Sequence, residues 1–156
     1  MKTFSWALAA FILLSDRLSK ILVSSYLQPG EYITTPGDFF RIALVHNTGA
    51  AFGILKGHTS VFAIISAIAV FSITLFLIYE HNRLFLRDTG LSLILGGVLG
   101  NLFDRLRFGY VIDFLDFRVW PVFNIADSAI TIGVFLIALE YLRVNIKGNK
   151  NVSCII

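Results

Sequence analysis

The run Val61–Tyr79 holds 19 consecutive uncharged residues, and it limits what this chain can fold into more than any other stretch. A helix needs about 20 apolar residues to cross the hydrocarbon core of a bilayer. Hydrophobic residues make up 56% of the 156 residues and charged residues only 15%, whereas soluble proteins carry about 25% charged residues. The pattern predicts an all-α membrane protein with one domain, residues 1–156.

Three further apolar segments have the length of membrane helices, so we predict four spans, at residues 4–27, 61–79, 89–107 and 127–145. The first segment follows Lys2 and therefore also resembles a signal peptide. No small-x-small cleavage pattern follows it, and apolar residues resume after Lys20. We therefore expect an uncleaved first helix, with a removed signal peptide as the alternative.

The longest polar segment, residues 28–58, lies between the first two predicted spans. Turn residues at 28–30 and 34–38 separate two short stretches rich in aromatic and β-branched residues, Glu31–Ile33 and Phe39–Val45. We expect both stretches to be strands and residues 46–53 to form a glycine-bearing loop or re-entrant corner. His46 and His58 are too isolated to form a metal site.

Four spans place both termini on one side of the membrane. The basic residues favour that side as the cytoplasm, because Lys2, Arg83, Arg87, Arg143, Lys147 and Lys150 outnumber Arg41, Lys56 and Arg118 in the opposite loops. The net charge of +3 is scattered without a basic run, so we expect no nucleic-acid partner.

Most of the polar residues inside the apolar chain fall between Gly96 and Asp127. The predicted third helix carries Gly96 and Gly100 at the spacing that lets helices approach closely. Asn101, Asp104 and Arg105 follow on one helical face. Asp113, Asn124 and Asp127 come next, and the Asp16–Lys20 pair in the first helix lies at the same predicted level. We expect one polar site at the outer membrane surface.

The available side chains restrict the chemistry of such a site. Serine catalysis lacks a GxSxG motif, and Ser19 and Lys20 are adjacent, so they do not face each other on a helix. Cys154 is the only cysteine and has no histidine nearby, and there is no HExxH motif for a metal. Carboxylates remain. From these residues alone, an aspartate-based hydrolase and a non-enzymatic membrane module, such as a small transporter or lipid-binding subunit, both stay open.

Two aspartates that share a proton can hydrolyse an amide, because the ionised one activates water and the protonated one donates to the carbonyl oxygen. We expect Asn124 to cap the fourth helix with Asp127 in its first turn, where the helix dipole favours the ionised form. The apolar neighbours of Asp113 favour its neutral form. For Asp104 we expect a structural role, as a charge pair with Arg105 that ends the third helix.

Five blocks give the chain a resemblance to a known family. They are Asp16-x-x-Ser19-Lys20; Asn47-x-Gly49-Ala50-Ala51-Phe52; Gly96-Gly97-x-x-Gly100-Asn101-x-x-Asp104-Arg105; Val111-Ile112-Asp113-Phe114; and Pro121-x-Phe123-Asn124-x-Ala126-Asp127-Ser128. In this order the blocks resemble those of lipoprotein signal peptidase (signal peptidase II), a bacterial intramembrane aspartyl protease family. The G-x-G-D motif of presenilin and prepilin peptidase types is absent.

The resemblance implies a role for each block. It implies that Asp113 and Asp127 are the catalytic pair and that 28–58 forms a small β-cradle on the outer face of the membrane. It further implies a substrate pocket and its support, formed by Asn47, Gly49, Asn101, Arg105 and Asn124 with Asp16, Lys20 and Asp104 behind them.

The implied reaction is cleavage of a prolipoprotein just before its diacylglyceryl-modified cysteine, with no metal or organic cofactor. The implied place is the bacterial cytoplasmic (inner) membrane, with the site on the extracytoplasmic side and the termini in the cytoplasm. We expect membrane lipid as a partner and a monomeric enzyme.

Overall fold

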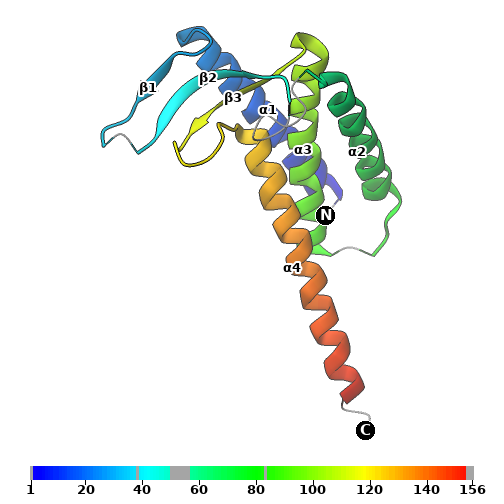
Figure 1. Ribbon diagram of the computed structural model, residues 1–156. Coiled ribbons are helices and arrows are strands. Elements are labelled where there is room, and N and C mark those ends of the chain that lie inside the picture. Colours follow the sequence, from blue (N-terminus) through cyan, green and yellow to red (C-terminus); the bar gives the residue numbers. More distant parts are fainter. Residues whose placement is uncertain (1, 38, 50–56, 83, 154–156) are drawn as a thin grey trace.

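The computed structural model describes residues 2–37, 39–49, 57–82 and 84–153. Within them the chain forms four long helices and a small sheet (Figure 1). The helices are α1 (Lys2–Tyr26), α2 (Thr59–Tyr79), α3 (Phe85–Phe108) and α4 (Ile125–Ser153). The strands are β1 (Tyr32–Thr34), β2 (Arg41–Asn47) and β3 (Val111–Asp116). Each predicted span therefore corresponds to a helix.

Two of these helices are apolar and long enough by composition to cross a membrane: residues Thr59–Tyr79, and Ile125–Ile146 within α4. Only 6% and 22% of their most apolar windows are buried inside the protein. The core helix of a soluble protein would be mostly buried, so these surfaces suit a lipid environment. Helices α1 and α3 have 25 and 24 residues but carry more charges.

The helix ends differ from the prediction at two places. Helix α3 begins at Phe85, four residues before the predicted start at 89. Asp88 lies in that first turn, where a carboxylate interacts favourably with the helix dipole. Helix α4 continues to Ser153, beyond the predicted end at 145.

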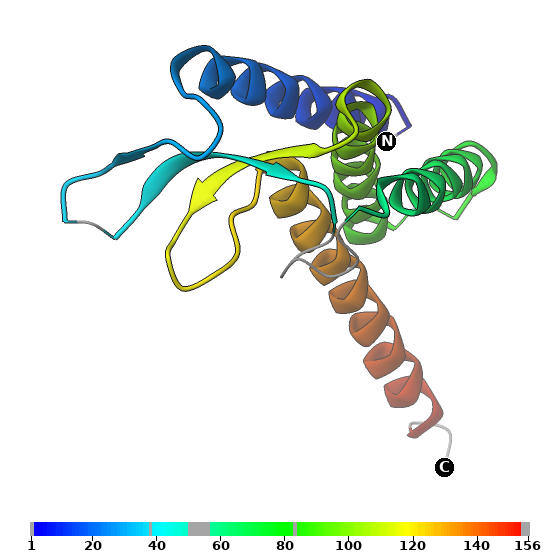
Figure 2. The same cartoon turned by 45° about the horizontal axis from the view of Figure 1, so that its top comes forward.

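Helix α3 is the centre of the helical part and contacts the other three helices. Its glycines allow this close packing. A Cβ atom on Gly96 would lie 2.5 Å from the Ala9 carbonyl oxygen of α1, and one on Gly97 would lie 2.5 Å from the Ala126 oxygen of α4. The predicted packing role of these glycines is confirmed. Figure 2 shows α1, α2 and α4 arranged around α3.

The three strands form one antiparallel sheet in the order β1-β2-β3. Ile33 pairs with Ile42, and Val45 pairs with Asp113 after a register shift between Ile42 and Val45. The first two strands confirm the predicted strands to within about two residues. His46 and Asn47 end β2 rather than opening a loop, and residues 50–53 of that predicted loop lie outside the described residues.

The predicted cradle between the first two helices supplies two of the three strands, and β3 comes from the connection between α3 and α4. We predicted no strand in this connection. The stretch from Val111 to Leu115 is instead rich in residues that favour strands, and it pairs along β2. The sheet therefore carries Asp113 itself.

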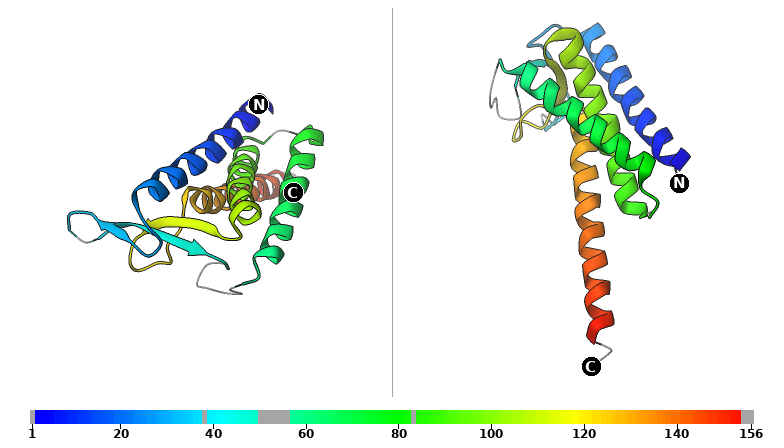
Figure 3. Two further views of the ribbon diagram at one scale, coloured as in Figure 1. Left: turned by 90° about the horizontal axis from the view of Figure 1, so that it is seen from above. Right: turned by 90° about the vertical axis from the view of Figure 1, so that its right-hand side faces the viewer.

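The sheet lies at the end of the helical part where α1 and α3 finish and α4 begins, and it projects sideways from the helices (Figures 1 and 3). Helix α4 starts beneath the sheet and extends past the other helices at the opposite end. Both termini point away from the sheet (Figure 1). Residues from β2, β3, α3 and α4 thus meet at one level.

Candidate active site

Two carboxyl groups from different elements open onto one cavity. Asp113 lies in the middle of β3 and is 2% exposed, and Asp127 lies in the first turn of α4. Both side chains line a cavity of about 630 Å³. The packing of β3 against the start of α4 therefore places the two predicted catalytic carboxyls at one site.

Amide groups hold Asp113 from two directions. The Asn47 Nδ2 donates to Asp113 Oδ2 at 2.8 Å, and the Asn124 Nδ2 donates to Asp113 Oδ1 at 2.7 Å. Asn47 reaches Asp113 because β2 and β3 are neighbouring strands. The Gly49 N–H donates to Asn47 Oδ1 at 2.9 Å, so the donor end of that amide faces the carboxyl.

The start of α4 is capped as predicted. Asp127 N–H donates to Asn124 Oδ1 at 2.9 Å, and Asn124 N–H donates to Asp127 Oδ2 at 3.3 Å. This reciprocal pair satisfies two backbone donors at the helix start and fixes both side chains. The prediction that Asn124 caps the helix with Asp127 in its first turn is confirmed.

A third amide reaches Asp127. Asn101 Nδ2 donates to Asp127 Oδ1 at 2.8 Å, while its Oδ1 accepts hydrogen bonds from Lys20 Nζ at 3.0 Å and Asn124 Nδ2 at 3.2 Å. An ammonium group has only donors, so Lys20 requires the oxygen of Asn101 on its side. The nitrogen of Asn101 must then face Asp127. Lys20 thereby determines which end of the amide meets the carboxyl.

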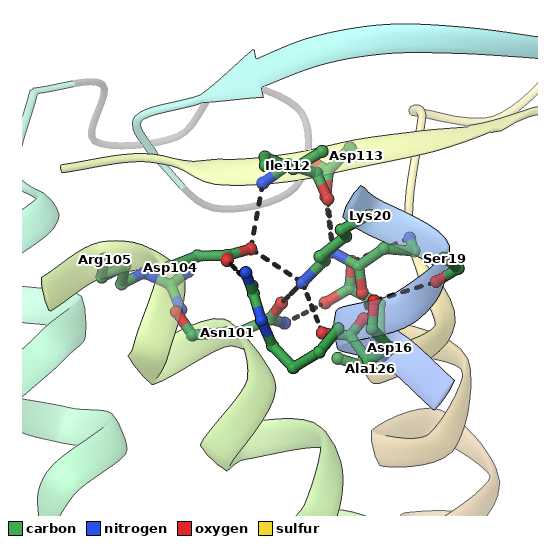
Figure 4. A network of polar contacts seen from close by, with 12 residues as sticks. Asp16, Ser19, Lys20, Asn101, Asp104, Arg105, Ile112, Asp113 and Ala126 are labelled. Carbon is green, nitrogen blue, oxygen red and sulfur yellow. Dashed lines mark hydrogen bonds and ion pairs between the residues drawn. The ribbon is translucent and has the colours of Figure 1, made fainter. Parts of the chain in front are cut away.

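Lys20 is fully buried and lies between two carboxylates (Figure 4). Its Nζ is 2.7 Å from Asp16 Oδ2 and 2.8 Å from Asp104 Oδ2. Backbone groups add hydrogen bonds to both carboxylates: Ala126 N–H donates to Asp16 Oδ1 at 3.0 Å, and Ile112 N–H donates to Asp104 Oδ2 at 3.2 Å. A buried charge is tolerated only with such partners. The network joins α1, α3, β3 and α4 behind the cavity.

The expected pairing of Asp104 with Arg105 is wrong. Asp104 is fully buried and forms ion pairs with Lys20 and Arg17. It lies a full turn before the end of α3 at Phe108, and its partners are on α1 and β3. The structural role expected for Asp104 fits this position, but through different partners.

Arg105 lies at the cavity instead. Its Nη1 donates to the Asn101 carbonyl oxygen at 3.5 Å, and its guanidinium lies 5.5 Å from the centre of the Phe62 ring of α2. Gly49 is buried and also lines the cavity. Much of the remaining wall is apolar, with Val111, Phe117, Val122, Phe123, Ile130 and Ile132.

Burial raises the pKa of Asp113 to about 7, and the nearby charge of Asp127 acts in the same direction. The hydrogen bonds from Asn47 and Asn124 oppose this rise in pKa, because they stabilise the carboxylate. A carboxyl with a pKa near neutral pH can hold a proton and release it during a reaction. This fits the neutral form predicted for Asp113.

All ten residues singled out from the sequence lie at the cavity or in the network behind it. Their convergence is confirmed, and their individual roles stay predictions. Among the described residues, no three His, Cys, Asp or Glu side chains come together as metal ligands.

The sequence model of the Signal peptidase (SPase) II family matches residues 8–143. The chain belongs to the signal peptidase II family. Curated relatives agree with this match. A lipoprotein signal peptidase from Moorella thermoacetica is 46% identical over 136 residues, covering 86% of this chain and 90% of that protein. One from Halothermothrix orenii is 44% identical and covers 82% and 88%.

The fold of this signal peptidase II family member also matches a solved structure. A bacterial membrane enzyme determined by the in meso method at 2.3 Å resolution aligns with a TM-score of 0.84 and 34% identity. The alignment covers 90% of this chain and 88% of the other. A second structure of a bacterial membrane enzyme, at 1.9 Å resolution, gives a TM-score of 0.81.

Some residues of the signal peptidase II site were missed in the sequence. Arg17 pairs with Asp104, although helical spacing offers no signal for a contact across 87 residues. Thr131 lines the cavity one turn after Asp127, and its hydroxyl donates to the Asp127 carbonyl oxygen at 2.8 Å. The i+4 spacing is a signal that indicates this position. Phe117 and Trp120 reach the cavity from an irregular loop, which has no periodicity to indicate it.

Proposed function

We propose that the chain removes the signal peptide of prolipoproteins by hydrolysis at Asp113 and Asp127, immediately before the diacylglyceryl-modified cysteine. Family membership confirms a peptidase over the transporter or lipid-binding alternative. The observation that carries the assignment of the two aspartates is their position. Both line one cavity, and each is held by asparagine amides.

The hydrogen bonds support a division of roles between the two carboxyls. Asp127 receives hydrogen bonds from the Asn101 amide and from the Asn124 N–H, and it lies at a helix start. Donors and the helix dipole both favour its ionised form. Asp113 has a pKa of about 7 because it is buried. The pair titrates as a unit, and a single shared proton resides on Asp113 in the resting enzyme.

The reaction then needs only water and this proton. Asp127 takes a proton from water as the oxygen attacks the scissile carbonyl carbon, and Asp113 gives its proton to the carbonyl oxygen. The tetrahedral intermediate collapses, the C–N bond breaks, and the leaving amine takes up a proton from Asp127. The hydroxyl proton returns to Asp113, so one shared proton remains on the pair.

Lys20 supports this chemistry from behind. Its ammonium holds the oxygen of Asn101, so the Asn101 amide presents only a donor to Asp127. A flipped amide would present an acceptor and would require the proton to be on Asp127. The buried network of Asp16, Lys20 and Asp104 therefore keeps the proton on the other carboxyl.

The same proposal places the enzyme in the bacterial cytoplasmic membrane as one domain with four spans. Helices α1 and α3 have 25 and 24 residues, about 36 Å or more at 1.5 Å per residue, enough for a core of about 30 Å. Six of their nine charged residues lie in the halves of the helices nearer the sheet, where the site would lie at the extracytoplasmic surface. Basic residues at the opposite end support termini in the cytoplasm.

The cavity suits a lipid-modified peptide. Its wall is largely apolar, and it continues along α4 past the dyad to Thr131 and Ile132. A diacylglyceryl group can occupy apolar space there while the scissile bond lies beside the carboxyls. One chain supplies both carboxyls and their amide partners, so we propose a monomer.

The deciding experiment is cleavage of a diacylglyceryl-modified prolipoprotein by wild type, Asp113→Asn and Asp127→Asn in lipid. Loss of kcat by about 10³-fold or more is expected for each variant, because neither amide can replace its carboxyl in proton transfer. Asp116→Asn is the matched control, since Asp116 lies on the same strand outside the cavity lining. Substantial activity in either dyad variant, with folding intact, would remove that residue from the mechanism.

A further inference from the structure

Large apolar side chains are exposed at the end of the sheet that lies farthest from the helices. Phe39, in the connection between β1 and β2, is 70% exposed, and Val119 and Trp120, in the loop after β3, are 88% and 60% exposed. We call these three residues the sheet tip. Tyr32 and Ile33 on β1 are also exposed. Water is a poor solvent for such a group of side chains.

The sheet tip is held in shape by its own contacts. Leu115 and Phe123 pair across the base of the loop, with hydrogen bonds of 2.7 and 3.1 Å. At its turn, Arg118 has a φ of 64°, and Val119 N–H donates to the Phe117 oxygen at 2.8 Å. Few non-glycine residues adopt this left-handed conformation. The tight turn therefore keeps Val119 and Trp120 pointing outward instead of folding back.

One aromatic residue joins the two halves of the sheet tip. The Phe117 ring lies 6.0 Å from that of Phe39, 5.0 Å from Phe40 and 5.8 Å from Phe123. The hairpin end and the loop thus form one surface. The same loop lines the catalytic cavity with Phe117, Trp120, Pro121 and Val122. Whatever covers the sheet tip lies next to the cavity.

The position of the sheet tip indicates what covers these exposed side chains. The free ends of the sheet curve back until they lie level with the first turns of α4 (Figures 1 and 3). Below that level, α4 exposes Ile132 and Phe135, part of an apolar surface that suits lipid. The sheet tip extends the apolar surface of α4 to the side of that helix. Tryptophan is enriched where membranes meet water. Arg118, which precedes Val119 and Trp120, has a side chain long enough to keep its charge in water beside apolar neighbours.

We propose that the sheet tip inserts into the outer leaflet of the membrane and opens the catalytic cavity directly to lipid. The partner is the interfacial region of the bilayer itself, the glycerol level and the upper acyl chains. Inserted, Trp120 lies both in lipid and at the cavity wall. The acyl chains of a substrate then pass from the leaflet into the cavity without crossing water. This last step rests on the proposed function, and the insertion does not.

The depth of Trp120 tests insertion without any measure of activity. The chain has two tryptophans, Trp6 and Trp120, so Trp6→Phe leaves Trp120 as the single emitter. The variant is reconstituted in phosphatidylcholine brominated at shallow or deep acyl positions. We expect strong quenching, greater for shallow than for deep bromines, and little quenching by aqueous iodide. Trp120→Phe, which keeps only Trp6, is the matched control for quenching that does not come from the sheet tip.

Two results would overturn insertion. One is iodide quenching of Trp120 with no bromolipid quenching, which would place the sheet tip in water. The other is an absence of both iodide and bromolipid quenching of Trp120 at every lipid-to-protein ratio, which would mean that a second copy of the chain covers the sheet tip.

Val119→Asp tests the link to substrate entry, because Val119 does not line the cavity. We expect KM for a diacylglyceryl-modified substrate in bilayers to rise about tenfold with kcat nearly unchanged, and Val119→Leu to match wild type. An unchanged KM in Val119→Asp would refute the link. A wild-type enzyme that inserts Trp120 but cleaves nothing would refute the proposed function and leave the insertion standing.

Discussion

At the scale of single residues, the site depends on which end of each asparagine amide faces a carboxyl. Gly49 N–H fixes Asn47, Asp127 N–H fixes Asn124, and Lys20 fixes Asn101, each by donating to the side-chain oxygen. The three nitrogens then all point at Asp113 or Asp127. Hydrogen-bond donors therefore surround Asp113 and Asp127. The shared proton of the proposed mechanism is held by those lone pairs of the two carboxyl groups that accept no other hydrogen bond.

The pH dependence of cleavage follows from Asp113. The proposed mechanism needs its protonated form, so wild-type activity should fall as the pH rises through about 7. In Asn47→Leu the carboxylate loses a hydrogen bond that lowers its pKa. The pKa of Asp113 then rises, and the alkaline limb of kcat should move up by about one pH unit.

The measurement is a kcat–pH profile of each protein with a lipid-modified peptide. Thr48→Val is the control, since the Thr48 side chain is exposed beside Asn47. An alkaline limb that stays in place or moves to lower pH in Asn47→Leu would show that Asp113 is not the proton donor.

At the scale of elements, the packing of α3 against α4 aligns the site. Asn101 is on α3 and its partner Asp127 is on α4, so their 2.8 Å hydrogen bond depends on how closely the helices approach. Gly97 sets that approach, because even one added carbon would lie 2.5 Å from the Ala126 oxygen and 2.9 Å from Ile130 Cγ1. The predicted role of glycine here was packing, and the structure adds its consequence for the site.

Gly97→Ala should therefore reduce both stability and activity. We expect a loss of about 1–3 kcal/mol in the free energy of unfolding, the usual cost of overpacking, and a fall in kcat. Unfolding in detergent micelles measures the first and peptide cleavage the second. Ala67→Val on the exposed surface of α2 should change neither. A Gly97→Ala protein as stable and active as wild type would mean that α3 and α4 separate without harm.

At the scale of the whole molecule, a buried ionic network lies at one end of a largely apolar helical body. Asp16, Lys20 and Asp104 come from two helices and meet beneath the sheet. Away from this end, α2 and α4 expose apolar side chains over most of their surface. A bilayer would suit this division, and the proposed location puts the network at its outer surface and the apolar helices in its core.

The orientation of the chain can be measured by thiol labelling. In a Cys154→Ser background, which has no other cysteine, single cysteines replace Glu31 before β1 or His81 after α2. Both positions are exposed. A membrane-impermeant maleimide should label Glu31→Cys on intact cells, and should label His81→Cys only after permeabilisation. The reverse pattern would place the dyad in the cytoplasm and contradict the proposed location.

The sequence by itself determined the helices and the membership of the site. Apolar runs and helical spacing are local properties, so they predicted four helices, the Asp16–Lys20 pair and the cap of α4 by Asn124. The blocks that resemble the family contain all ten residues singled out for the site. Only the tertiary structure decided that β3 joins the sheet, that Asp104 pairs with Arg17, and how each amide is turned. These features join residues such as Asn47 and Asp113, 66 positions apart, or Asp16 and Ala126, 110 apart. Local periodicity predicts which face of a helix or strand a residue occupies. The residue that it contacts on another element depends on how distant segments of the chain pack together.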